Sequence, residues 1–212
     1  MQYLIAFLVT FSFLFAWDKA FSTEVDTGNI LTNSTFGTGD TTTTTGWSTS
    51  GDDGIHTHGE WGFPYQTGMD DSGGVLAFEG HEEDNVYQDV DLVGDGHLTQ
   101  PEMKQGFTST MGADVWFWNN IENTLTLKQT VTGADGSVST QVREITDSTT
   151  GVGTFTNYTN VYTQGSNTQT DITIRAELFN ETAGTAYDNS HRGPDVDNVT
   201  LNITYNEIPP IN

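Results

Sequence analysis

The sequence predicts an all-β protein, an antiparallel β-sandwich of about eight strands. Helical spacing of apolar residues is nearly absent after the N-terminal segment. Apolar and polar residues instead alternate in several segments, as they do in strands with one buried and one exposed face. These segments are separated by Gly, Asp and Asn, which favour turns. A closed barrel is the main alternative for the same pattern.

Individual strands can be placed from this alternation. The clearest cases are 199–205, with apolar residues at every second position, and 172–178, where Thr173, Arg175 and Glu177 form the polar face. Segments 124–131 and 138–145 flank a Gly- and Asp-containing turn and predict a hairpin. The remaining expected strands are 29–36, 75–79, 86–92, 114–118 and 154–163.

The N-terminus predicts export. Residues 3–17 are an almost unbroken apolar run, too short for a membrane span of about 20 residues. Ala20 and Ser22 occupy the small-residue positions of a cleavage site, so we expect residues 1–22 to be a signal peptide. An uncleaved anchor is the alternative. We expect one domain over 23–207, a tail over 208–212, and a secreted or cell-surface location without membrane insertion of the mature chain.

Charge and cysteine content limit the partners. The chain has 29 Asp and Glu against 6 Lys and Arg, a net charge of −23, which disfavours nucleic acid and anionic membranes. It has no cysteine, so disulfides and thiolate chemistry are excluded. The acidity fits either solubility in a salty exterior or calcium binding by a few clustered carboxylates.

Several short motifs resemble one broad family. They are 29–36 followed by Gly46 and Trp47, then 75–80 with 86–90, and finally 195–201, where an acidic pair precedes Val-x-Leu. Together they resemble the galactose-binding-like jelly rolls, which include many carbohydrate-binding modules.

The resemblance implies a structural calcium between the first-strand region and the last strand. Its ligands here would be Asp197, Asp195 and a group near Asn33. Gly37 follows Phe36 where the family commonly has an acidic residue. The alternative is that both aspartates are turn and edge residues.

Aromatic residues suggest two candidate glycan sites, because sugar rings stack on flat apolar faces. Trp116 and Trp118 share one side of an expected strand and form either an exposed platform or part of the core. A Gly-rich loop carries the second set, Trp61, Phe63 and Tyr65 beside His56 and His58.

Two metal motifs are incomplete. His56, His58 and Glu60 could converge on a transition metal if they lie on a strand, but a solvated loop is the preferred interpretation. Segment 91–102 matches part of an EF-hand, but Val93 offers no side-chain oxygen at the third position. We therefore expect a strand followed by a turn there.

No residue set dictates a reaction, so the leading hypothesis is a secreted, non-catalytic, calcium-stabilised module that binds extracellular glycans. A structural or adhesive surface or virion-associated protein, with self-association through edge strands, is the first alternative. A polysaccharide-acting enzyme is the second.

Overall fold

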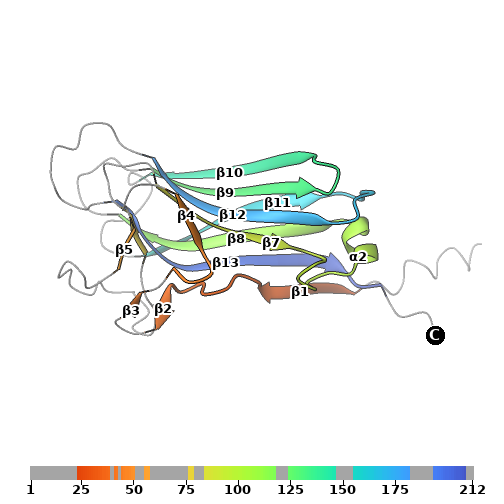
Figure 1. Ribbon diagram of the computed structural model, residues 1–212, viewed down its shortest axis with the longest axis horizontal. Helices are drawn as coiled ribbons and strands as arrows, with labels where there is room; N and C mark the ends of the chain where they lie inside the picture. The colour runs from red at the N-terminus through yellow and green to blue at the C-terminus, as the bar shows by residue number, and fades with distance from the viewer. Residues whose placement is uncertain are drawn as a thin grey trace, which may run out of the picture.

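Two antiparallel sheets form the two layers of the computed structural model (Figure 1). The structure describes residues 23–38, 41–42, 44–50, 55–57, 76–78, 84–117, 124–146, 155–181 and 193–208. One sheet has six strands in the order β11-β8-β13-β6-β5, with β1 also paired to β13. The other has five in the order β10-β9-β12-β7-β4, and β2 and β3 pair separately. The predicted antiparallel β-sandwich is confirmed.

The strands differ widely in length. Their bounds are β1 Glu24–Asn29, β2 Gly37–Thr38, β3 Thr41–Thr42, β4 Ser48–Ser50, β5 Ile55–Thr57, β6 Leu76–Phe78, β7 Asp84–Asp91, β8 Phe107–Trp116, β9 Thr124–Gly133, β10 Val138–Thr146, β11 Thr156–Gln164, β12 Ile172–Glu181 and β13 Asp195–Asn206. Eight of these strands, counted over the described ranges, have six or more residues, which agrees with the expected number.

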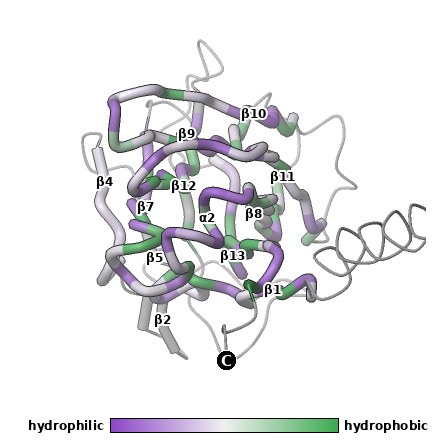
Figure 2. The backbone as a smooth tube through the Cα atoms, turned by 90° about the vertical axis from the view of Figure 1, so that its right-hand side faces the viewer, coloured by the Kyte–Doolittle hydropathy of each residue, from purple (hydrophilic) through white to green (hydrophobic). Residues whose placement is uncertain are grey.

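The core lies between the two sheets. On β12 the alternate residues Ile172, Ile174 and Leu178 are at most 2% exposed, and on β13 Leu201 and Ile203 are fully buried. Seen along the strands, the two sheets separate into two layers (Figure 2). The alternation read from the sequence at 172–178 and 199–205 therefore describes one face turned to the core.

The strand expected over 29–36 is wrong. β1 ends at Asn29, and the chain then turns with Asn33 and Phe36 at positive φ angles of 51° and 52°. Leu31 and Phe36 are buried all the same. Apolar side chains that a turn buries therefore gave a pattern resembling a strand.

Strand β8 is longer than expected. The prediction covered 114–118, whereas β8 runs from Phe107 to Trp116. Its inward positions include Ser109 and Ala113, and Gly112 interrupts the outer face. Small and polar residues at buried positions hide the two-residue period.

The short helix α2, Gln100–Gln105, was not expected. Glu102 caps the N-terminus of α2. The Glu102 Oε2 atom accepts hydrogen bonds from the backbone nitrogen of Thr99 at 2.8 Å and from the Thr99 hydroxyl. Glu102, the last position of the partial EF-hand match, thus caps a helix. α2 lies at one end of the two layers (Figure 1), where its Met103 is fully buried. No helix in the described ranges is long and apolar enough to cross a bilayer.

A chain of polar side chains crosses the core near the edge formed by β10 and β11. The Ser109 hydroxyl donates to Gln129 Oε1, and Gln129 Nε2 donates to the Asn160 carbonyl at 2.7 Å. Asn160 Nδ2 donates to the carbonyls of Leu127 and Gln141 at 2.9 and 3.0 Å. Because these buried polar groups are hydrogen-bonded, they fix how the two sheets meet.

Candidate functional site

An open groove runs over the outer face of the five-stranded sheet. Its volume is about 510 Å³, within the range of small-ligand pockets. Strands β7, β9, β10 and β12 supply its lining, which is mostly polar: Asp89, Lys128, Thr130, Thr132, Val138, Thr173, Arg175 and Glu177. On β7, β9 and β12 these residues face outward because the alternate residues of the same strands fill the core.

Arg175 is held rigidly in this groove. Its Nε and Nη2 donate to the two carboxylate oxygens of Asp89 at 2.7 and 2.8 Å, a bidentate pair between directly opposed residues of β12 and β7. The guanidinium carbon also lies 3.9 Å from the centroid of the Tyr87 ring. The hydrogen bonds that Arg175 donates to Asp89 raise the pKa of Arg175, so the guanidinium keeps its charge.

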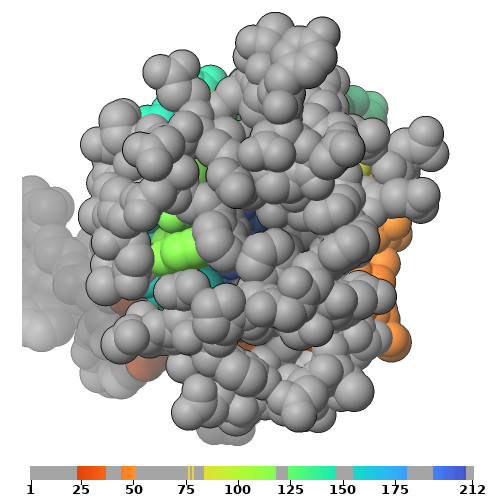
Figure 3. Space-filling model, turned by 90° about the vertical axis from the view of Figure 1, so that its left-hand side faces the viewer, coloured from red at the N-terminus to blue at the C-terminus, as the bar shows by residue number. Residues whose placement is uncertain are grey.

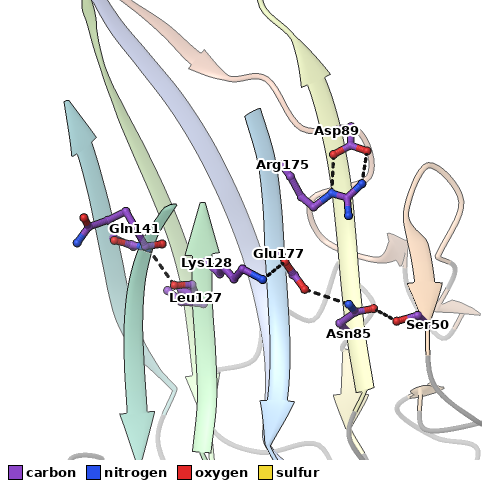
Figure 4. Close-up of polar contacts among 9 residues, drawn as sticks. Ser50, Asn85, Asp89, Leu127, Lys128, Gln141, Arg175 and Glu177 are labelled. Atoms are coloured by element: carbon purple, nitrogen blue, oxygen red, sulfur yellow. Dashed lines mark hydrogen bonds and ion pairs between the residues drawn. The ribbon is translucent and has the colours of Figure 1, made fainter. Parts of the chain in front are cut away.

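A second polar network lies beside this pair. Lys128 Nζ is 3.0 Å from Glu177 Oε2, and Asn85 Nδ2 donates to Glu177 Oε1 at 3.0 Å (Figure 4). The Ser50 hydroxyl of β4 donates in turn to Asn85 Oδ1. Glu177 is only 6% exposed, so its carboxylate is held in place before any ligand arrives.

The charges of the groove cancel. Lys128 pairs with Glu177 and Arg175 with Asp89, which uses two of the six basic residues of the chain. A carboxylate accepts about four hydrogen bonds and a guanidinium donates five, so both pairs retain capacity for a ligand. The arrangement suits hydroxyl groups, which donate and accept, better than a charged ligand.

The predicted aromatic sites are only partly described. Trp116 is 4% exposed, and its neighbours Val115 and Phe117 are also buried, so Trp116 offers no exposed face to a ligand. Of the His-containing loop, His56 lies on β5, while its side chain is outside the described part of the structure. Trp61, Phe63, Tyr65, His58 and Trp118 lie outside the described residues.

The end of the molecule at which β8 finishes is seen in Figure 3. Described residues of the central strands reach this surface in places, and residues around β4, in orange, lie along one side.

Glu60, the third member of the His motif, is also outside the described residues. Within the described ranges, no group of three or more His, Cys, Asp or Glu side chains is placed to hold a metal ion.

The residues expected to hold calcium lie on two segments that meet. The backbone nitrogen of Val199 donates to the Ser34 carbonyl at 2.9 Å, which joins the Asn33 turn to the irregular part of β13 after Asp197. Asp195 and Asp197 are 3% and 1% exposed. Burial raises the pKa of Asp195 to about 8.

The side chains of Asp195 and Asp197 carry carboxylate oxygens, which are hard ligands of the kind that calcium prefers. Asp197 Oδ1 accepts a hydrogen bond from the backbone nitrogen of Asn198 at 2.7 Å. The Asn33 side chain is partly engaged, since its Nδ2 donates to the Thr45 carbonyl at 3.2 Å.

Sequence reasoning missed the groove. It identified Arg175 and Glu177 as polar-face residues of one strand but not their partners, which lie 86 and 49 positions away at Asp89 and Lys128. One signal for the groove was available in the sequence. The chain has only six basic residues, and two of them, Lys128 and Arg175, fall at outward positions of strands.

No protein-family model matches the chain, and no curated protein does. Similar solved structures include carbohydrate-binding modules, the class that the sequence motifs resemble. TmCBM61 in complex with β-1,4-galactotriose is 12% identical, with a TM-score of 0.43 over 82% of this chain and 97% of that one. A structure of carbohydrate-binding modules from the β-sandwich superfamily, described for promiscuous specificity, is 12% identical, with a TM-score of 0.41 over 74% of this chain.

A third similar structure is the enzymatically active domain of bacteriophage CBA120 tailspike protein 4, which is 15% identical with a TM-score of 0.45 over 82% of this chain. The chain spans 21% of that structure's length and 56% of the length of the promiscuous module. Likenesses this distant carry no argument about function, which has to come from the side chains of the groove.

Proposed function

We propose that this chain binds a neutral glycan in the groove of the five-stranded sheet. The proposal rests on two neighbouring ion pairs, Arg175–Asp89 and Lys128–Glu177, each formed by residues that lie opposite each other on adjacent strands. Together they present fixed hydrogen-bond donors and acceptors side by side and carry no net charge. Sugar hydroxyls need donors and acceptors together. A uronate or sulfate would meet no unpaired cation among the groove's described residues, on a chain of net charge −23.

Three further elements belong to the same proposal. Residues 1–22 direct export, so the glycan is extracellular. Calcium bound by Asp195, Asp197 and oxygens near Asn33 stabilises the turn against β13. The protein binds its glycan without a catalytic step.

A structural or adhesive role is the second candidate. The observation that favours it is the burial of Trp116, since an adhesive sandwich keeps that side chain in its interior. Self-association of the chain would then take the place of a small ligand.

A glycan-array screen of the purified protein, in millimolar calcium and again in EDTA, tests the proposal. We expect binding to neutral glycans that Arg175→Ala abolishes. The matched control is Arg143→Ala, because Arg143 also stacks on a tyrosine, 5.3 Å from the Tyr158 centroid, but lies outside the groove. Equal loss in both variants, or no binding under either condition, would favour the adhesive role.

A further inference from the structure

Five Asn residues of the chain begin the tripeptide Asn-x-Ser/Thr, the acceptor sequence for N-linked glycosylation. They are Asn33, Asn157, Asn180, Asn198 and Asn202. A sequence this short also arises by chance in a chain rich in Asn and Thr. A glycosylated Asn must in addition lie at the surface of the folded protein, because the attached glycan is bulky and hydrated. Strand position and burial therefore distinguish the five candidates.

Asn157 meets this requirement. It lies on β11, the edge strand of the six-stranded sheet, and it is exposed. Tyr158, the middle residue of its tripeptide, turns into the core and is 8% exposed. Asn157 and the exposed Thr159 therefore both point away from the core, as alternate residues of a strand do. Among the described strands β11 pairs with β8 alone, so Asn157 lies at the rim of the sheet.

The hydrogen bonding of Asn157 is compatible with a glycan. Its Nδ2 donates to Asp114 Oδ1 at 2.8 Å, on the outer face of β8. An amide nitrogen carries two hydrogens, and an N-linked glycan replaces one of them. The bond to Asp114 can therefore persist in the modified protein while the other position of Nδ2 carries the sugar.

Asn180 fails the same requirement. It follows Ile174, Ala176 and Leu178 in the inward series of β12 and is fully buried. A glycan at Asn180 would have to enter the space between the two sheets, which core side chains fill. The remaining three candidates are half-buried, Asn198 and Asn202 on β13 and Asn33 in the turn after β1.

We infer that Asn157 is an acceptor of N-linked glycosylation and that Asn180 is not. The inference goes beyond glycan binding in the groove and shares with the proposed function only the export of the chain, because N-linked glycans are added to exported proteins. The glycan stands on the outer face of the six-stranded sheet, whereas the groove lies on the outer face of the other sheet. Modification at Asn157 thus leaves the groove open.

Glycopeptide mapping of the full-length protein tests the inference. The chain is produced in a eukaryotic host behind that host's own signal sequence, so that its delivery for glycosylation does not depend on residues 1–22. Trypsin then separates the candidates, since it leaves Asn157 in peptide 144–175, Asn180 in 176–192, and Asn198 with Asn202 in 193–212. We expect a glycan on peptide 144–175 in most copies of the folded protein and none on peptide 176–192.

An unmodified peptide 144–175, or a glycan on peptide 176–192 of the folded protein, would overturn the inference. Peptide 144–175 of protein that the host retains is mapped by the same criterion. Mapping measures modification alone, so failure of the groove to bind a ligand would contradict the proposed function and leave this inference standing.

Two variants at one position complete the test. Thr159→Ala removes the acceptor sequence but keeps Asn157 and its bond to Asp114, so the glycan should be lost from peptide 144–175. Thr159→Ser keeps the acceptor sequence and should keep the glycan. Both changes are made at an exposed side chain and leave the backbone carbonyl that Arg143 contacts in place. Equal modification of the two variants would overturn the inference.

Discussion

Arg175 and Asp89 lie directly opposite each other on β12 and β7 and form a bidentate ion pair, with the guanidinium stacked on Tyr87. Three contacts thus fix one planar group at the centre of the groove. Its donors that do not face Asp89 remain available to a ligand.

Replacing Arg175 by Lys should separate ligand binding from stability. Lysine keeps the charge but cannot make the bidentate pair or stack its plane on Tyr87. We expect glycan affinity to fall by at least tenfold, measured by calorimetry. The free energy of unfolding should fall by no more than about 1 kcal/mol, since the pair is well exposed and screened by solvent. Arg143→Lys should change neither quantity appreciably, and a larger loss of stability than of affinity would contradict the expectation.

The polar network in the core should dominate stability at the β10–β11 edge. Asn160→Ala removes the amide that serves the Leu127 and Gln141 carbonyls and leaves them without this donor. We expect a loss of about 2–4 kcal/mol in urea unfolding. The control is Asn157→Ala on the same strand, which removes one exposed bond to Asp114 and should cost less than about 1 kcal/mol. Similar losses in the two variants would show that the network adds little.

The hydroxyl of Thr126 offers a test in the opposite direction. Its Oγ1 is buried and has no hydrogen-bond partner among the residues that the structure describes. Thr126→Val removes that group with little change of shape, so the free energy of unfolding should stay constant or rise by about 1 kcal/mol. A loss greater than about 1 kcal/mol in urea unfolding would show that the hydroxyl is engaged.

Stability should depend on pH through Asp195. Its pKa is about 8 in the fold against 3.8 as the ordinary value, so the folded state holds a proton that the unfolded chain releases. Below about pH 4 the carboxyl is protonated in both the folded and the unfolded state, so it does not change the free energy of unfolding. As the pH rises from about 4 to 8 the free energy of unfolding falls, by at most roughly 1.4 kcal/mol per pH unit. Unfolding in EDTA at several pH values should show this slope, and Asp195→Asn should flatten it.

The same titration tests the calcium proposal. Calcium favours the ionised carboxylates of Asp195 and Asp197, so millimolar calcium should restore the stability lost near pH 8. Equal curves in calcium and EDTA would contradict a calcium ion at these residues.

The sequence predicted best where one face of a strand is uniformly apolar. Ile172, Ile174 and Leu178 gave β12 directly, and the turn around Gly136 gave the β9–β10 hairpin. Where buried positions hold small or polar side chains, as at Ser109 on β8, the alternation of apolar and polar residues could not be recognised in the sequence. Where a turn buries its apolar residues, as at Leu31, a strand was predicted wrongly.

The groove could not be predicted in this way, because it depends on register. Lys128 meets Glu177, and Arg175 meets Asp89, only once β12 is paired with β9 on one side and β7 on the other. A shift of one residue would turn these side chains to the other face. No local pattern around any of the four residues specifies that pairing.

The side-chain bonds between β10 and β11 have one more consequence. These strands are the outer edges of their sheets, and such edges can recruit strands from other molecules. The Asn160 side chain of β11 donates a hydrogen bond to the Gln141 carbonyl of β10, and the Arg143 side chain of β10 donates one to the Thr159 carbonyl of β11. A side chain on each edge strand is therefore hydrogen-bonded to one backbone carbonyl of the other edge strand. An incoming strand would have to break these two bonds before it could pair at these residues, so they oppose strand addition at the middle of both edges.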